Sequence, residues 1–203
     1  MEKMIVRIST EIGESINVMR AMLVDEALLT AIARVAVTLM DVYSRGGKIL
    51  IAGNGGSAAD AQHFAAEIVC TFARRDRKAR PAMALHTDTS ALTAWANDFN
   101  FETFFSRCIE AHGKSGDAVV LISTSGNSVN MVNAVETANR KGLTVIGLLG
   151  KGGGALGKDK LLNEHIIVPS NSTARVQESH ILLIHILCMF LEEHFVELDA
   201  QGK

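Results

Sequence analysis

The sequence contains few cysteines, and those it has form no recognisable pattern. Cys70, Cys108 and Cys188 are an odd number of residues, far apart in the chain and set among apolar neighbours. This distribution excludes a disulfide framework and predicts three reduced cysteines in the core of a cytoplasmic protein.

An excess of charge of either sign is also missing, and so is a long hydrophobic run. The formal net charge is −2, with acidic and basic residues interspersed, so we expect neither a nucleic-acid partner nor a membrane surface. The most apolar stretch, residues 181–191, is interrupted by His185 and is too short to span a bilayer. Residues 1–8 contain no long apolar core, which argues against a signal peptide.

No linker or low-complexity segment divides the chain, so we expect a single domain of residues 1–203. Its first part, residues 1–46, carries two amphipathic helical patterns that meet at Asp25, a candidate capping residue. We expect these two helices to form an N-terminal hairpin used in oligomerisation. An α/β core of residues 47–203 follows.

Within the core, short apolar runs alternate with helical patterns. The predicted strands are residues 48–52, 82–85, 118–123, 144–148 and 165–168, and the predicted helices between them are 57–70, 89–111, 129–141 and 154–160. Such alternation predicts a three-layer α/β sandwich with a central five-stranded parallel sheet.

A long final helix is predicted over residues 173–197, and between residues 181 and 191 it is apolar nearly all round. A helix of that kind must be covered on every side. We interpret it as buried in an oligomer. The alternative is a central helix of a single domain.

Two loops at strand C-terminal ends are candidate ligand sites, because open α/β sheets bind ligands there. Residues 123–128 read Ser-Thr-Ser-Gly-Asn-Ser. Their hydroxyls and the helix start that follows suit a phosphomonoester, whereas the absence of lysine excludes a Walker P-loop. The alternative is a serine-rich capping turn.

The other loop, residues 53–57, reads Gly-Asn-Gly-Gly-Ser and leads into the helix that carries Asp60, His63 and Glu67. Gly53, Gly55 and Ala58 satisfy the loose dinucleotide fingerprint, but the acidic residue expected about 20 positions later is missing, so nicotinamide binding is disfavoured. His63 and Glu67 share a helix face, either as functional residues or as a surface pair. Asp60 lies on nearly the same face, where an acid in the first turn also suits the helix dipole.

In the final helix, three polar residues interrupt the apolar surface: Gln177, His180 and His185. A buried histidine is more often a hydrogen-bonded core residue than a ligand. Three polar groups on one apolar helix weaken that interpretation, and a functional site is the alternative.

Taken together, these motifs resemble the phosphoheptose isomerases of the SIS (sugar isomerase) superfamily over nearly the whole chain. The matching segments, in order, are residues 53–57, 60–67, 87–94, 97–98, 123–128 and 174–180. The resemblance implies a flavodoxin-like fold and an aldose–ketose isomerase that converts sedoheptulose 7-phosphate to D-glycero-D-manno-heptose 7-phosphate, the first step toward the heptose of lipopolysaccharide. It also implies one zinc ion per active site and a homotetramer with active sites at subunit interfaces.

Matching positions imply a role for each site residue. Glu67 and His185 would be the acid/base pair, and the zinc ligands would be His63, Glu67, Gln177 and His185. Substrate contacts would come from Asn54, Gly55, Gly56, Ser57, Glu67, Asn97, Asp98 and Gln177, and phosphate contacts from Ser123, Thr124, Ser125 and Ser128.

The chemistry needs these residue types. Moving a carbonyl between C1 and C2 through an enediolate requires proton carriers such as a carboxylate and an imidazole. A zinc ion polarises the carbonyl. A tight zinc ligand has its lone pair occupied, so Glu67 is either ligand or free base in a given step.

Helix geometry adds a prediction about assembly. Gln177 and His185 are eight residues apart, about 12 Å along a helix axis, whereas zinc bonds are about 2 Å long. We therefore expect one of the two to reach the ion from a neighbouring subunit.

The chain departs from the family at two places. Cys70-Thr71 stands where Gly-Arg is common, and Gly152 stands where aspartate is common. The contact of that arginine is then lost or passes to Arg74 or Arg75, and we expect an effect on substrate preference.

Two other functions remain open: a non-catalytic SIS protein that binds a partner, as relatives acting on the replication initiator do, and an SIS isomerase of another phosphosugar. Retention of Glu67 and His185 argues against the first, and the four-residue metal set argues against the second.

Overall fold

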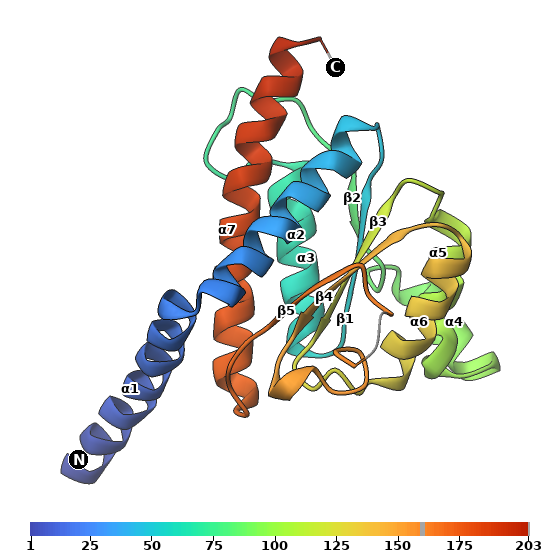
Figure 1. Cartoon of the computed structure of the whole chain (residues 1–203). Helices are drawn as coiled ribbons and strands as arrows, with labels where there is room; N and C mark the ends of the chain where they lie inside the picture. Colours follow the sequence, from blue (N-terminus) through green and yellow to red (C-terminus); the bar gives the residue numbers. More distant parts are fainter. Residues whose placement is uncertain (159–160, 203) are drawn as a thin grey trace.

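A five-stranded parallel sheet forms the centre of the computed structural model, which describes residues 1–158 and 161–202 (Figure 1). The strands, in spatial order β2-β1-β3-β4-β5, are β2 Ala82–Ala84, β1 Ile49–Gly53, β3 Ala118–Ser123, β4 Thr144–Leu149 and β5 Glu164–Ile167. This is the flavodoxin-like order. The predicted fold class is confirmed.

Helices cover both faces of the sheet. On one face lie α2 Glu26–Ser44, α3 Gly56–Val69 and α7 Thr173–Ala200; on the other lie α4 Thr89–Asp98, α5 Phe104–His112 and α6 Val129–Arg140 (Figure 1). Strand residues alternate between two cores: Ile49 and Ile51 pack toward α2, α3 and α7, whereas Leu50 and Ala52 pack toward α5 and α6. Burial on both faces explains the uninterrupted apolar runs.

The predicted helix 89–111 is divided in the structure. A 3-10 turn, η1 Phe101–Thr103, lies between α4 and α5. The Asn100 side chain accepts a hydrogen bond from the Thr103 amide at 2.9 Å, which starts a new helical segment there. The continuous helix was therefore wrong because an internal capping residue was overlooked.

Between β4 and β5 the predicted short helix 154–160 is wrong in its described part. Residues 154–157 form turns after η2, a 3-10 turn at Lys151–Gly153. Residues 159–160 of that prediction lie outside the described residues.

The N-terminal segment forms two helices, α1 Glu2–Val24 and α2, with Asp25 capping α2 through the Leu28 amide at 3.0 Å. They do not form the predicted hairpin, because one connecting residue cannot reverse the chain. Figure 1 shows α1 projecting away from the body of the protein. Its apolar stripe is exposed in the single chain, with Ile5, Ile8 and Ile12 each 56% accessible.

Helix α7, in contrast, is covered largely within its own chain. Leu183, Leu187 and Leu191 are fully buried in the core shared with α2, α3 and the sheet, whereas Met189 and Phe190 stay partly exposed. The alternative of a central helix therefore accounts for most of its apolar surface. The argument for a partner applies to α1 instead.

The structure also bears on two smaller predictions, the placement of the cysteines and the absence of a membrane span. Cys108 and Cys188 are buried free thiols, but Cys70 ends α3 and is exposed, so its placement in the core was wrong. By length and apolarity alone α2 could cross a membrane, which is weak evidence because core helices pass the same test. Its apolar residues Val35, Leu39 and Val42 are fully buried in the core.

Candidate functional site

The two candidate loops follow adjacent strands whose helices lie on opposite faces of the sheet, β1 before α3 and β3 before α6. This is the switch point at which α/β sheets bind ligands. Asn54 of the first loop and Asn130 in the first turn of α6 exchange two amide hydrogen bonds, each 3.0 Å. The pair holds the two loops at a fixed separation. Asn130 is buried, and sequence reasoning missed it.

The serine loop has an internal hydrogen-bond network. Ser123 Oγ accepts the Gly126 amide at 3.1 Å, and Ser125 Oγ accepts the Asn127 amide at 3.2 Å. Each hydroxyl keeps its proton for a further acceptor. Ser128 is the N-cap of α6 but its side chain makes no capping bond. The capping alternative therefore fails for Ser128, and the loop presents hydroxyl donors beside a helix N-terminus.

A glycine-rich segment, residues 150–154, packs directly against the serine loop. A side chain on Gly126 would meet the Gly153 carbonyl at 1.9 Å, so only glycine allows this approach. Asn127 Oδ1 accepts the Ala155 amide at 2.8 Å. Gly152 has φ +72° with open space around it, a conformation that glycine adopts freely and aspartate tolerates.

The proposed acid/base and metal residues meet between α3 and α7. His63 Nε2 lies 2.9 Å from Glu67 Oε1, and the His63 and His185 ring centroids are 5.2 Å apart. The Phe72 ring lies 5.8 Å from that of His185. Burial raises the pKa of the Cys188 thiol to about 12, and the nearby Glu67 carboxylate adds to the effect. Glu67 therefore faces α7, and one chain brings His63, Glu67 and His185 together.

These residues suit a metal ion by type. Adjacent ligand atoms on a tetrahedral zinc ion lie about 3.3 Å apart, close to the separation of His63 Nε2 and Glu67 Oε1. Among the described residues, no three histidine, cysteine, aspartate or glutamate donors converge closely enough to hold a metal by themselves. The described residues of one chain therefore do not assemble the zinc set that the resemblance implies, and zinc binding stays a prediction.

Gln177 lies farther along the same helix pair. Its Nε2 atom would be 2.2 Å from a side chain added at Gly56, so it packs on the first turn of α3. Gly56 is seven residues, or about 10 Å, before His63 along α3. Since His185 already lies beside His63, the predicted contribution of a second chain applies to Gln177. That Gln177 reaches the zinc ion of a neighbouring subunit stays a prediction.

Three further polar residues have distinct roles in the structure. His180 is fully buried and its Nε2 lies 3.2 Å from the Leu149 carbonyl oxygen, so it is a core histidine whose pKa burial lowers to about 4. Burial raises the pKa of Asp60, against the opposing effect of His63. Burial also lowers the pKa of His86, which lies near the Ala58 carbonyl. Asp60 belongs to α3 itself, and His86 lies beside the first turn of that helix.

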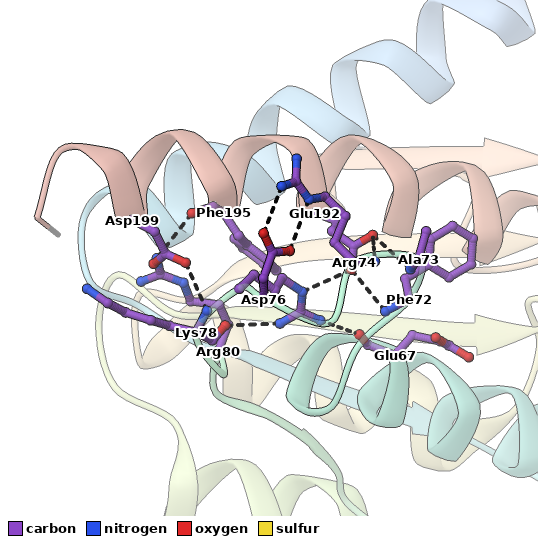
Figure 2. Close-up of polar contacts among 11 residues, drawn as sticks. Glu67, Phe72, Ala73, Arg74, Asp76, Lys78, Arg80, Glu192, Phe195 and Asp199 are labelled. Carbon is purple, nitrogen blue, oxygen red and sulfur yellow. Dashed lines mark hydrogen bonds and ion pairs between the residues drawn. The ribbon is translucent and has the colours of Figure 1, made fainter.

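A charged network missed by sequence reasoning connects α7, the loop after α3 and the backbone of Glu67 (Figure 2). Glu192 of α7 accepts hydrogen bonds from the loop after α3 and pairs with the buried Arg77 at 3.1 Å. Arg77 Nη2 donates to the Glu67 carbonyl oxygen at 2.6 Å. The available signal was a glutamate seven residues after His185 on an apolar helix. Arg74, one of the two candidates to take over the contact of the family's arginine, pairs with Asp76 at the surface.

Asn97 and Asp98 are not brought to this cluster. They end α4, which lies on the opposite side of the sheet from α3 and α7 (Figure 1). Both are exposed, and Asn97 Nδ2 donates to Asp98 Oδ1 at 2.9 Å. Ser57 of the first loop is buried. The substrate contacts implied for these residues stay predictions.

Comparison with known proteins places these features in a family. The sequence pattern of the SIS domain matches residues 14–150. A phosphoheptose isomerase from Aneurinibacillus thermoaerophilus is 50% identical over 186 residues, which are 92% of each chain. A solved phosphoheptose isomerase from Neisseria gonorrhoeae has a TM-score of 0.86 at 40% identity, covering 94% of this chain and 99% of that one. The structure of another, from Francisella tularensis, has a TM-score of 0.88 at 34% identity, covering 93% and 98%.

Proposed function

This chain belongs to the SIS domain family and, within it, to the phosphoheptose isomerases, and on that premise we propose that it converts sedoheptulose 7-phosphate to D-glycero-D-manno-heptose 7-phosphate. The observation that carries the proposal is the meeting of Glu67 with His63 and His185 between α3 and α7. A carboxylate and an imidazole on facing helices are suitable proton carriers near neutral pH.

In the proposed reaction, Glu67 takes a proton from C1 of the ketose and an enediolate forms. The proton is returned at C2, and His185 moves a proton between the oxygens on C1 and C2, so the carbonyl passes to C1. Reactant and product are isomers, and no other reagent is consumed. This conversion is the first step of heptose synthesis for lipopolysaccharide.

Substrate binding is proposed to involve both loops. The free hydroxyl protons of the serine loop and the N-terminus of α6 favour a phosphate at residues 123–128. The glycine turn, with Asn54, Gly55 and Gly56, then takes the sugar end. The Asn54–Asn130 pair keeps the two loops in fixed relation.

A zinc ion is proposed at His63, Glu67, Gln177 and His185. When bound, it supplies Lewis-acid polarisation of the substrate carbonyl. The histidine and carboxylate donors are of the types that zinc prefers. As a ligand, Glu67 would have to release one oxygen to act as base.

The assembly is proposed to be a homotetramer in the cytoplasm. Support comes from the exposed apolar stripe of α1, since monomeric proteins seldom leave such a continuous face in water. A second chain docked there, with active sites at the subunit interfaces, would also be the source of the Gln177 contribution.

The test is incubation with sedoheptulose 7-phosphate, with aldose formation followed by NMR. We expect turnover in the purified protein, a loss with a zinc chelator, and recovery when zinc is added back. A protein that binds the sugar phosphate but never forms aldose, with or without zinc, would contradict the enzymatic assignment. Turnover unaffected by chelation would contradict the zinc proposal alone.

A further inference from the structure

The Glu192 carboxylate is the most fully hydrogen-bonded charged group near the site. Its Oε1 accepts the Phe72 amide at 3.0 Å and Arg77 Nε at 3.1 Å. Its Oε2 accepts the amides of Ala73 at 2.8 Å and Arg74 at 3.0 Å. A carboxylate has about four lone-pair sites, and all four are used here. One side chain of α7 therefore fixes the whole start of the loop after α3.

That loop contacts both members of the acid/base pair. Toward α7 it places the Phe72 ring beside His185. Toward α3 it places the Arg77 guanidinium on the carbonyl oxygen of Glu67 itself. Carbonyls in the last turn of a helix have no partner within the helix, so Arg77 satisfies one and adds a cation where the helix dipole favours it.

Arg77 is as enclosed as its partner. Its side chain is 1% exposed and that of Glu192 is 6% exposed. Besides Glu192 and Glu67, Arg77 donates to the Lys78 carbonyl oxygen at 3.1 Å. The planar guanidinium thus joins three elements in one fixed geometry, which a lysine cannot reproduce.

We infer that Glu192 and Arg77 are positioning residues for the acid/base pair, holding the last turn of α3 and the Phe72 ring so that Glu67 and His185 keep their relative placement. The inference rests on the proposed function. Misplacing catalytic groups by about 1 Å costs about a hundredfold in rate, so the effect belongs in kcat rather than in substrate affinity.

The chain offers a matched control. Asp199, seven residues after Glu192 on α7, accepts the Lys78 amide at 2.8 Å and pairs with Arg80. It ties the same loop to the same helix with the same types of group. It makes none of the contacts to Phe72 or to the Glu67 carbonyl that are described for Glu192 and Arg77. A merely structural role would give both carboxylates the same phenotype.

The experiment compares Glu192→Gln, Arg77→Lys and Asp199→Asn with the parent protein. In Glu192→Gln, an NH₂ group replaces one carboxylate oxygen and faces two N–H donors, so the hydrogen bonds at that position are lost. We expect its kcat for sedoheptulose 7-phosphate to fall by about tenfold to a hundredfold with KM within about twofold. Arg77→Lys should lose at least about fivefold in kcat, and Asp199→Asn should keep its kcat within about twofold. All three are assayed well below their unfolding temperatures.

Equal losses in Glu192→Gln and Asp199→Asn, or a parental kcat in folded Glu192→Gln, would overturn the inference. A second readout is independent of turnover: the imidazole NMR shifts of His185, assigned with His185→Gln, in the purified protein without substrate. Relative to the parent protein, we expect the His185 imidazole shifts to change in Glu192→Gln and to be unchanged in Asp199→Asn. If the parent protein fails to isomerise the sugar phosphate, these shifts still decide the positioning role. Unmoved shifts would overturn it.

Discussion

Helices α1 and α7 are both rich in apolar residues, yet one projects from the molecule and the other is enclosed by it. In α1 the apolar residues form one stripe along an otherwise polar helix, and that stripe is exposed. In α7 they occur all round, and α2, α3 and the sheet cover them. The difference shows that apolar content alone does not identify an interface. A stripe without a cover in its own chain is the feature that supports the proposed assembly.

The largest expected effect concerns the polar residues that interrupt α7. His185→Gln, or Glu67→Gln opposite it, should lower isomerisation by about 10²- to 10⁴-fold, the usual contribution of a positioned acid or base. Rates are measured at saturating sugar phosphate, with circular dichroism to show that the fold is kept. Near-normal turnover in either variant would refute its role. If His185→Gln is the variant that turns over normally, α7 loses its proposed acid/base residue.

A stability comparison should separate the two helices next. Leu187→Ala removes a fully buried side chain of α7 and should cost about 2–5 kcal/mol at any protein concentration. Ile12→Ala should cost within about 0.5 kcal/mol in dilute protein and more as the concentration rises, because association stabilises the folded chain. Urea unfolding at several concentrations measures both. A concentration-independent loss for Ile12 would place it in a monomer core instead.

Charges on the α1 stripe should break the assembly. Ile8→Glu with Ile12→Glu buries two carboxylates in the proposed interface and should weaken self-association at least about a hundredfold. Thr10→Glu, on the other side of the same helix, is the control and should leave the mass unchanged. Analytical ultracentrifugation gives the masses. If the double variant keeps the parental mass, the stripe is not the interface.

The smallest effect concerns pH and again distinguishes α7 from α1. Burial alone would raise the pKa of Glu192, but hydrogen bonds from the amides of Ala73 and Phe72 and from Arg77 hold it below its ordinary value of 4.5. A carboxylate with a lowered pKa stabilises the fold above pH 4.5 and loses that contribution as the pH falls through its folded-state value.

The difference in Tm between the parent and Glu192→Gln should therefore narrow on acidification below about pH 4.5. The difference for Ile12→Ala, in which no titrating group is removed, should not follow the same course. A Glu192→Gln difference that stays constant down to pH 3 would contradict the hydrogen-bonded carboxylate. Thermal scans from about pH 7 to pH 3 provide the measurement.

Much of the fold could be predicted from the sequence because buried parallel strands leave continuous apolar runs. All five strands were found within two residues of their observed ends. The division of the helix 89–111 at Asn100 and the direction of α1 were not predicted, because each depends on one residue at a helix boundary. Periodicity reports the face of a helix but not its direction in space.

Only part of the candidate site was predicted from the sequence. The chain brings His63, Glu67 and His185 together, as the motifs indicated. Arg77 and Glu192 were missed, because a buried ion pair joins positions 115 residues apart and leaves no local pattern. The same holds for Asn130, whose partner Asn54 is 76 residues away. Such contacts follow from the assembled fold rather than from spacing.

The Asn54–Asn130 pair also constrains how this sequence can change over generations. Each amide is at once donor and acceptor to the other, so an aspartate at either position would set oxygen against oxygen. A hydrophobic residue at either would leave the other amide without this partner, and at position 54 it would leave the buried Asn130 unpaired. Neither asparagine can be replaced alone without a penalty, and among descendants of this chain the two positions should be inherited, or exchanged, as a unit.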